Sequence, residues 1–187
     1  MSRQRSIITR ARAGRAAPHR SAGAPRPVSC AVITVSDTRR GREDTAGARI
    51  ERLILRAGHR VATRAWVKDE PAALRRAARA ALARPDVDAL VVTGGTGLGP
   101  RDRTPEALAP LVERAVPGFG ELFRVVSVHQ VGPAAWLSRA EAFVARGRLV
   151  VLLPGSLAAV DLALRELLLP ELVHAVRMLG RFRTSEA

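Results

Sequence analysis

Residues 93–107 read Thr93-Gly94-Gly95-Thr96-Gly97-Leu98-Gly99-Pro100-Arg101-Asp102-Arg103-Thr104-Pro105-Glu106-Ala107, directly after the apolar run Val87-Asp88-Ala89-Leu90-Val91-Val92. A buried strand, a glycine-rich turn, an acidic residue and a helix start in this order are typical of α/β proteins. Such proteins bind anions at the carboxyl end of the sheet. The stretch therefore predicts an α/β fold, with the candidate site in the turn.

The glycine-rich turn has the chemistry of a phosphate-binding loop. Gly94, Gly95 and Gly97 lack a Cβ, so their backbone N–H groups can approach ligand oxygens closely. Thr93 and Thr96 add hydroxyl donors. Neither a Gly-Lys-Ser/Thr ending nor the full Gly-x-Gly-x-x-Gly spacing is present. Because glycine motifs alone are weak evidence, a tight turn without a ligand remains the alternative.

The residues after the glycines predict a helix start and a cation ligand. Thr104 is a favourable N-cap, and Pro105 suits the first helical position. Asp102 lies between the loop and this helix. A carboxylate beside a bound phosphate is repelled by it, and a divalent cation bridging the two relieves that repulsion. The alternative is that Asp102 only caps the turn.

Length and charge distribution predict one folded domain with an extension. The chain has 187 residues, which suits a single domain. Residues 1–27 hold seven arginines and no acidic residue, which is half of the net charge of +14. This segment has little apolar surface to bury, so burial cannot offset the entropy cost of ordering it. We expect a disordered arm over 1–27, an α/β domain over 28–180 and a tail over 181–187.

Composition argues against several classes of partner. Only 3% of the residues are aromatic, and no nucleic-acid-reading motif is present, so no specific nucleic-acid partner is expected.

Lys68 is the only lysine, and this bias towards arginine favours a GC-rich bacterial source over a mitochondrial presequence. No apolar run suits a membrane span or a signal peptide, which predicts a cytoplasmic protein. Cys30, the single cysteine, is expected to be a free core residue.

Short apolar runs alternate with amphipathic segments from Val28 onward, as in a parallel sheet covered by helices. Strands are expected at 31–35, 60–67, 87–93 and 148–153, and helices at 44–55, 72–83, 104–114, 119–126, 156–168 and after Pro170. Residues 140–145 either form a hairpin with 148–153 or leave 148–153 as a lone parallel strand.

Three of these strands end in polar turns: Ser36-Asp37, the glycine loop, and Pro154-Gly155-Ser156. The carboxyl ends of parallel strands meet at one edge of a sheet. We therefore expect the three turns to converge on one crevice.

The motifs, taken together, resemble a known family. They are Thr93-Gly94-Gly95-Thr96-Gly97, Arg101-Asp102-Arg103-Thr104-Pro105-Glu106-Ala107, Pro117-Gly118-Phe119-Gly120-Glu121, Ser138-Arg139-Ala140 and Leu153-Pro154-Gly155-Ser156. In this order they resemble the molybdopterin adenylyltransferase family of the MoaB/Mog type, which takes part in molybdenum cofactor biosynthesis. The resemblance extends from about Cys30 to about Leu179.

The resemblance implies a fold and a reaction. The fold is a three-layer α/β/α sandwich with a mostly parallel sheet. The reaction joins AMP from ATP to molybdopterin and releases pyrophosphate, with Mg²⁺. The family pattern puts the two catalytic acidic positions, also the metal ligands, on Asp69 and Asp102. A non-catalytic molybdopterin-binding or carrier protein of the MoaB type is the alternative, and the presence of both aspartates favours the enzyme.

The resemblance and the converging turns also imply a set of substrate-binding residues. These are Ser36, Asp37, Thr93, Gly94, Gly95, Thr96, Gly97, Arg101, Thr104, Ser138, Pro154, Gly155 and Ser156. The family forms homotrimers or homohexamers, so a homo-oligomer is expected. A protein that inserts molybdate into the activated cofactor is the expected downstream partner.

Overall fold

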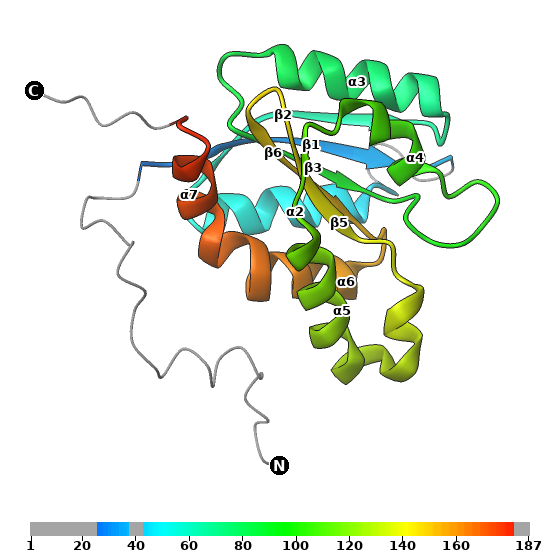
Figure 1. Ribbon diagram of the computed structural model, residues 1–187. Coiled ribbons are helices and arrows are strands. Elements are labelled where there is room, and N and C mark those ends of the chain that lie inside the picture. Colours follow the sequence, from blue (N-terminus) through cyan, green and yellow to red (C-terminus); the bar gives the residue numbers. More distant parts are fainter. Residues whose placement is uncertain (1–25, 38–42, 182–187) are drawn as a thin grey trace, which may run out of the picture.

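The computed structural model describes residues 26–37 and 43–181 (Figure 1). Most of the arm expected over 1–27, and the tail beyond residue 181, lie outside these residues. Within the described part of the chain, no helix has the length and apolarity needed to cross a membrane.

The core of the fold is one six-stranded sheet in the order β2-β1-β3-β6-β5-β4. Its parallel part comprises β1 (Ser29–Val35), β2 (Arg60–Val67), β3 (Ala89–Thr93) and β6 (Arg148–Leu153). The antiparallel part comprises β5 (Glu141–Ala145) and the two-residue edge strand β4 (Arg114–Ala115). The mostly parallel sheet predicted from the sequence is confirmed.

The hairpin between β5 and β6 answers the question that the sequence left open. Arg146 and Gly147 connect the two strands, with φ values of 51° and 65°. Positive φ at both central residues is what a two-residue hairpin turn of type I′ requires.

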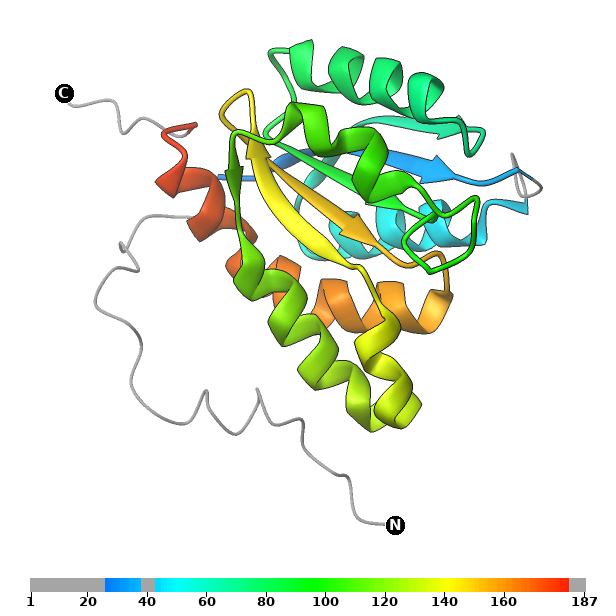
Figure 2. The ribbon, with the colours of Figure 1, turned by 45° about the vertical axis from the view of Figure 1, so that its right-hand side comes forward.

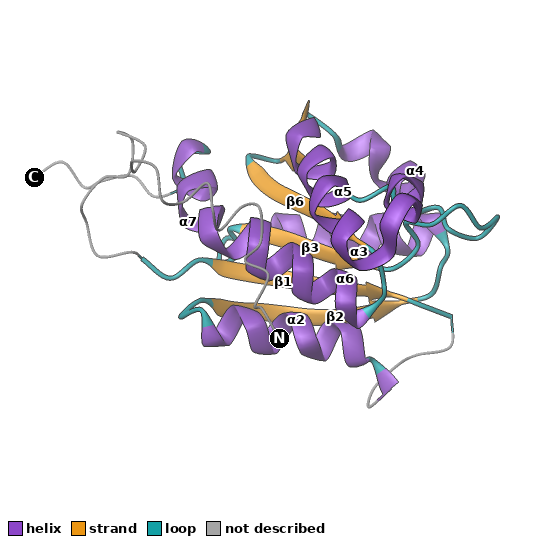
Figure 3. Ribbon diagram, turned by 90° about the horizontal axis from the view of Figure 1, so that it is seen from below, coloured by secondary structure: helices purple, strands orange, loops and turns teal. Residues whose placement is uncertain are grey.

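Helices cover both faces of the sheet, as Figures 1 and 3 show. One face carries α2 (Thr45–Arg56), α6 (Leu157–Leu162) and α7 (Leu169–Met178), and the other carries α3 (Pro71–Ala83) and α4 (Thr104–Leu108). Alternate residues of β1 enter the two cores: Cys30 and Val32 on the first face, Ala31 and Ile33 on the second. The predicted three-layer sandwich is confirmed.

Cys30 lies in the first of these cores, as predicted. Burial, together with the negative charge of Asp88, raises the pKa of its thiol to about 12. The thiol is therefore protonated and unreactive at neutral pH.

Two helix predictions near the glycine loop are wrong in their limits. The helix expected over 104–114 ends at Leu108, and a short 3-10 turn, η2 (Ala109–Leu111), leads into β4. Pro110 lies in this turn, and a proline cannot donate to an α-helical hydrogen bond. The helix expected over 119–126 is α5 (Pro117–Val131), which begins at Pro117 and ends before Gly132. Pro117 opens the helix because its missing N–H has no intrahelical partner at that position.

The last helices form one continuous element. Ser156 caps α6 as predicted, with its Oγ accepting a hydrogen bond from the N–H of Ala159. A π-helical segment, η4 (Ala163–Leu168), then joins α6 to α7 without a break. Pro170 near the start of α7 removes one helical donor, and the wider turns before it accommodate that loss.

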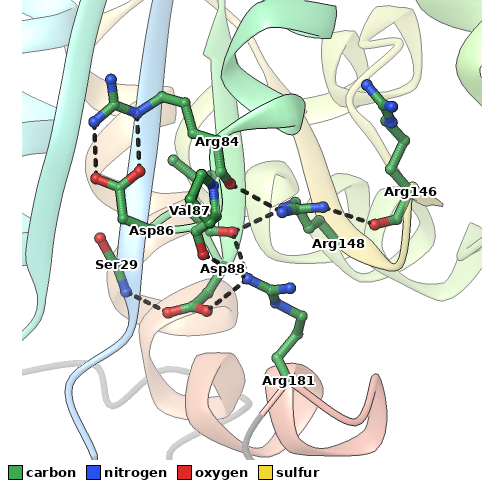
Figure 4. A network of polar contacts seen from close by, with 9 residues as sticks. Ser29, Arg84, Asp86, Val87, Asp88, Arg146, Arg148 and Arg181 are labelled. Carbon is green, nitrogen blue, oxygen red and sulfur yellow. Dashed lines mark hydrogen bonds and ion pairs between the residues drawn. The ribbon is translucent and has the colours of Figure 1, made fainter.

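A buried arginine, Arg148, forms a hydrogen-bond network at the amino end of the sheet (Figure 4). The side chain of Arg148, in a residue that is 9% exposed, donates to the carbonyl oxygens of Val87, Arg146 and Arg84 at 2.8–2.9 Å. Arg181 donates to the same Val87 oxygen at 3.1 Å and pairs with Asp88. This network lies at the opposite end of the strands from the glycine loop, so we assign it to stability.

Candidate functional site

The glycine loop follows β3 and is held against two neighbouring strands. The N–H of Gly94 donates to the carbonyl oxygen of Leu153 at the end of β6. Gly94 has a φ of 102°, and a Cβ on it would lie 2.2 Å from the carbonyl oxygen of Val35 at the end of β1. Only glycine fits this backbone conformation and this close approach.

Thr104 closes the loop instead of capping the following helix. Its hydroxyl donates to the carbonyl oxygen of Gly94 at 2.9 Å, and its N–H donates to the carbonyl oxygen of Gly95 at the same distance. The predicted N-cap role is therefore wrong: Arg103 precedes the helix, and Thr104 is its first residue. The reason is that the carbonyl of Gly94 lies close enough to take the hydroxyl hydrogen. Thr104 is fully buried, so its two hydrogen bonds hold the loop from the interior of the protein.

Three carboxylates meet at the loop, one from each of three segments. Asp37 follows β1, Asp69 follows β2, and Asp102 lies in the loop itself. The N–H of Asp69 donates to Asp37 at 3.2 Å, and a Cβ on Gly95 would lie 3.4 Å from both carboxylate oxygens of Asp69. Asp102 folds back over the loop, with Oδ2 accepting from the N–H of Gly99 at 3.0 Å. The structure thus brings together the two predicted catalytic aspartates.

The electrostatics of this cluster favour a cation. Burial raises the pKa of Asp69 above its ordinary value, and the negative charges of Asp37 and Asp102 raise it further. Arg101 opposes this shift, and its guanidinium pairs with Asp37 at 2.5 Å. The side chain of Arg101 is 69% exposed, so it remains accessible to a ligand.

Asp69 and Asp102 have the donor chemistry for Mg²⁺. Within residues 26–37 and 43–181, no group of three or more potential metal-ligating side chains has the geometry to hold an ion. Magnesium sites at phosphates characteristically use one or two carboxylates, with substrate oxygens and water completing the octahedron. Two carboxylates whose charges disfavour each other fit this pattern, because a bound cation removes the repulsion.

A pocket of about 210 Å³ opens between the ends of β1 and β3 and the start of α2. It is lined by Thr34, Val35, Ser36, Asp44, Thr45, Ala46, Thr93 and Gly155. Three predicted binding residues therefore share one cavity: Ser36, Thr93 and Gly155. The hydroxyl of Thr93 donates to the carbonyl oxygen of Pro154 at 2.9 Å, which joins this wall to the turn after β6.

Asp44 is a pocket residue that the sequence reasoning missed. It is 3% exposed, and Oδ2 accepts hydrogen bonds from Thr34 and Arg64 while Oδ1 accepts from the N–H of Gly47. The sequence indicated a helix start at Asp44, and Asp44 does cap α2. Its burial beside Thr34 depends on packing between segments, which the local pattern does not contain.

Arg139 is the second residue that the sequence reasoning missed as a site residue, although it lies in the Ser138-Arg139-Ala140 motif. Its side chain contacts Gly97, Asp102 and Glu106, and its N–H donates to the carbonyl oxygen of Thr96. The predicted neighbour Ser138 makes other contacts: its Oγ accepts from the N–H of Ala140, and its carbonyl oxygen accepts from Arg124 at 3.4 Å. The contacts with the glycine loop are thus made by Arg139, and Ser138 is its neighbour in the sequence.

Comparison with known proteins assigns this arrangement to a family. Residues 31–174 match the family described as "Probable molybdopterin binding domain". Molybdenum cofactor biosynthesis protein B of Bacillus subtilis (strain 168) is 45% identical over 155 residues, 82% of this chain and 91% of that protein.

Solved structures agree with this match. A crystal structure of a molybdenum cofactor biosynthesis protein B has a TM-score of 0.82 at 40% identity, and the match covers 86% of this chain and 100% of that one. The tungsten cofactor synthesizing protein MoaB from Pyrococcus furiosus has a TM-score of 0.71 at 34% identity, covering 83% and 98%.

The fold is that of a molybdopterin-binding α/β domain, and the chain belongs to that family. Within it, the chain is a molybdenum cofactor biosynthesis protein of the MoaB type.

Proposed function

We propose that this protein adenylylates molybdopterin. A terminal phosphate oxygen of molybdopterin attacks the α-phosphorus of ATP, and the bond from that phosphorus to the bridging oxygen breaks. The products are adenylyl-molybdopterin and pyrophosphate. The observation that carries the proposal is the convergence of Asp69 and Asp102 on one phosphate-type loop.

Transfer of the AMP group requires the protein mainly to position the two substrates and to neutralise the charge on their phosphates. The attacking phosphate is already an anion, so no general base is required. Backbone N–H groups of the glycine loop offer donors for phosphate oxygens. Arg101, which is exposed and pairs with Asp37, supplies positive charge for the nucleotide. Asp69 and Asp102 would hold Mg²⁺, which neutralises charge on the ATP phosphates when bound.

The pocket of about 210 Å³ is our candidate for binding molybdopterin. It adjoins the glycine loop through Thr93 and Gly155, and it offers the hydroxyl of Ser36 and the carboxylate of Asp44. A pterin ring carries amino and ring N–H donors, and a buried carboxylate is a strong acceptor for such groups. Ser156, directly after Gly155, adds a further hydroxyl at this edge.

We also propose that the protein self-associates through α5. Leu122, Val125 and Val128 follow one another at three-residue spacing on α5 and are each about half exposed. Trp136, in the 3-10 helix η3 (Gly132–Leu137), is 72% exposed. Figure 2 shows α5 and η3 at the periphery of the molecule. An apolar surface of this kind suits a second copy of the chain in a homotrimer or homohexamer.

The fate of labelled ATP tests the reaction. Purified protein is incubated with molybdopterin, Mg²⁺ and ATP labelled at either the α- or the γ-phosphate. The proposal predicts that the α-label enters molybdopterin and that the γ-label leaves as pyrophosphate in equal amount. Bound molybdopterin without label from the α-phosphate would identify a carrier and overturn the proposal. We expect the product to serve a molybdate-inserting protein in the bacterial cytoplasm.

A further inference from the structure

One side chain outside the glycine loop contacts the loop at two residues and also contacts the helix that follows it. The Nε of Arg139 donates to the carbonyl oxygen of Gly97 at 2.9 Å, and Nη2 donates to the carbonyl oxygen of Asp102. Nη1 forms an ion pair with Glu106 in α4. The N–H of Arg139 donates to the carbonyl oxygen of Thr96 at 3.2 Å. Arg139 therefore bridges the loop at Thr96 and Gly97, the acidic residue Asp102 and the helix that follows.

The guanidinium is well suited to this role because it is planar and presents several donors in fixed directions. A lysine, with one point charge on a flexible chain, cannot reach Gly97, Asp102 and Glu106 together. Arg139 itself lies just before β5, so these contacts tie the loop to the sheet.

Arg139 acts on the part of the loop that carries the Asp102 carboxylate. Its bond to the carbonyl oxygen of Asp102 fixes the peptide from which that side chain projects. Asp102 also packs against the loop glycines: a Cβ on Gly97 would lie 2.7 Å from Asp102 Oδ2, and one on Gly99 would lie 2.8 Å from it. A shift of the backbone at Gly97 or Asp102 would therefore move this carboxylate.

The charge of Arg139 is balanced by Glu106 in α4. Partial burial acts to raise the pKa of Glu106, but its backbone N–H, the Arg139 hydrogen bond and the nearby positive charges lower it overall. Glu106 is therefore ionised and paired with Arg139 at neutral pH. Arg101 differs, because its side chain is far more exposed than the 29% of Arg139.

We propose that Arg139 is the positioning residue for Asp102, setting the carboxylate for the magnesium-nucleotide half of the site and not for the pterin half. This inference rests on the proposed adenylylation for its kinetic readout. The pterin-side pocket is lined from β1 and the turn after it, from the start of α2, from the end of β3 and from the turn after β6, and Arg139 is absent from its lining. Loss of Arg139 should therefore affect the two substrates unequally.

The test compares Arg139→Met and Arg139→Lys with a matched control, Arg75→Met. Arg75 also donates its Nε to a carbonyl oxygen of α4, that of Ala107 at 2.9 Å, but it approaches from α3 and does not contact the loop. Both sites thus lose an arginine-to-backbone bond beside the same helix. The measurements are kcat, the Mg²⁺ concentration for half-maximal activity, and the Kd of molybdopterin.

We expect Arg139→Met to lower kcat about 100-fold, as misplacement of a reacting group by about 1 Å does. Its Mg²⁺ requirement should rise while its molybdopterin Kd stays within about twofold of wild type, a change worth under about 0.5 kcal/mol. Arg139→Lys should recover only a small part of the activity. Arg75→Met should keep wild-type kinetics. Millimolar methylguanidinium should raise the activity of Arg139→Ala, because it restores the planar donor group.

Two kinds of result would overturn the inference. One is a lower melting temperature in Arg139→Met with unchanged kcat and Mg²⁺ requirement, which would make Arg139 a stabilising residue only. The other is a loss confined to molybdopterin affinity. If wild-type protein does not adenylylate, the proposed function fails, but calorimetric titration with Mg-ATP still tests the inference: unchanged affinity in folded Arg139→Lys would refute it.

Discussion

The hydroxyl of Thr104 donates a hydrogen bond to the carbonyl oxygen of Gly94 across 2.9 Å, and this bond closes the glycine loop from its buried side. Gly95 lies between these two residues, with a φ of 64°, and a Cβ on it would lie 2.4 Å from the Thr104 hydroxyl oxygen. Any side chain at residue 95 therefore competes with the bond that shapes the loop.

Gly95→Ala is expected to weaken ligand binding more than folding. Gly58→Ala is the matched control, because Gly58 has a φ of 80° and a Cβ on it would meet no heavy atom within 4 Å. Both variants carry the left-handed backbone cost of about 1–2 kcal/mol, and only Gly95→Ala disturbs Thr104. Fluorescence titration should show native molybdopterin affinity in Gly58→Ala and at least about tenfold weaker binding in Gly95→Ala, the loss of one good hydrogen bond. Equal affinities would make the loop a structural turn only.

The raised pKa of Asp69 predicts a specific dependence of stability on pH. A group whose pKa is raised on folding stabilises the fold below its unfolded pKa, and that contribution is lost as pH rises through the folded pKa. Ionised Asp69 therefore disfavours folding at neutral pH, because of burial and the charges of Asp37 and Asp102. Asp69→Asn should raise the melting temperature at neutral pH and change it little below pH 3.8, the ordinary aspartate value.

Magnesium should reverse this effect in the wild-type protein. A bound cation compensates the carboxylate charges, so Mg²⁺ should raise the melting temperature of the wild type at neutral pH. The increase should be much smaller in Asp69→Asn. An equal increase in both proteins would mean that Mg²⁺ acts elsewhere.

Local sequence pattern was sufficient for the central sheet and for the loop. The apolar runs that became β1 and β3 are buried along almost their whole length, and each ends in the polar turn that was predicted. Gly94 and Gly95 take the positive φ that makes glycine necessary there. These features depend on neighbours in sequence, which is why composition and periodicity revealed them.

Contacts between distant segments were beyond that kind of reasoning. Arg139 meets Asp102 across 37 residues, and Arg64 meets Asp44 across 20. Thr104 has the residue type of an N-cap, yet the nearby Gly94 carbonyl takes its hydroxyl hydrogen. β4 is only two exposed residues long, and its pairing with β5 decides its conformation. In each case tertiary packing determines the outcome.

Arg148→Met should destabilise the protein without affecting the site. The substitution removes the guanidinium donor of the Arg146 and Arg84 carbonyl oxygens, and it leaves the Val87 carbonyl oxygen with Arg181 as its only guanidinium donor among the described residues. We expect a loss of about 2–4 kcal/mol in the free energy of unfolding, measured by urea denaturation. Arg79→Met, at an exposed position on α3, should change it by less than about 0.5 kcal/mol. A similar small effect at Arg148 would show that water replaces the lost donors.

The apolar face of α5 should control the oligomeric state. Leu122→Glu combined with Val128→Glu places two charges on this face, where burial against a second copy would be strongly unfavourable. Light scattering after gel filtration should show the wild type as a trimer or hexamer and the double variant as a monomer. Met178→Glu, at a position on α7 that is 75% exposed, is the control and should leave the oligomer intact. An unchanged oligomer in the double variant would place the interface elsewhere.

The most direct test of the two-carboxylate site measures turnover and molybdopterin binding on the same preparations of Asp69→Asn and Asp102→Asn. Each substitution removes a negative charge while nearly preserving size, so the loss should fall on the metal and the nucleotide. We predict that adenylyl-molybdopterin formation is abolished in both variants and that the Kd for molybdopterin remains that of the wild type. Wild-type turnover in either variant, or loss of molybdopterin binding in both, would contradict the account.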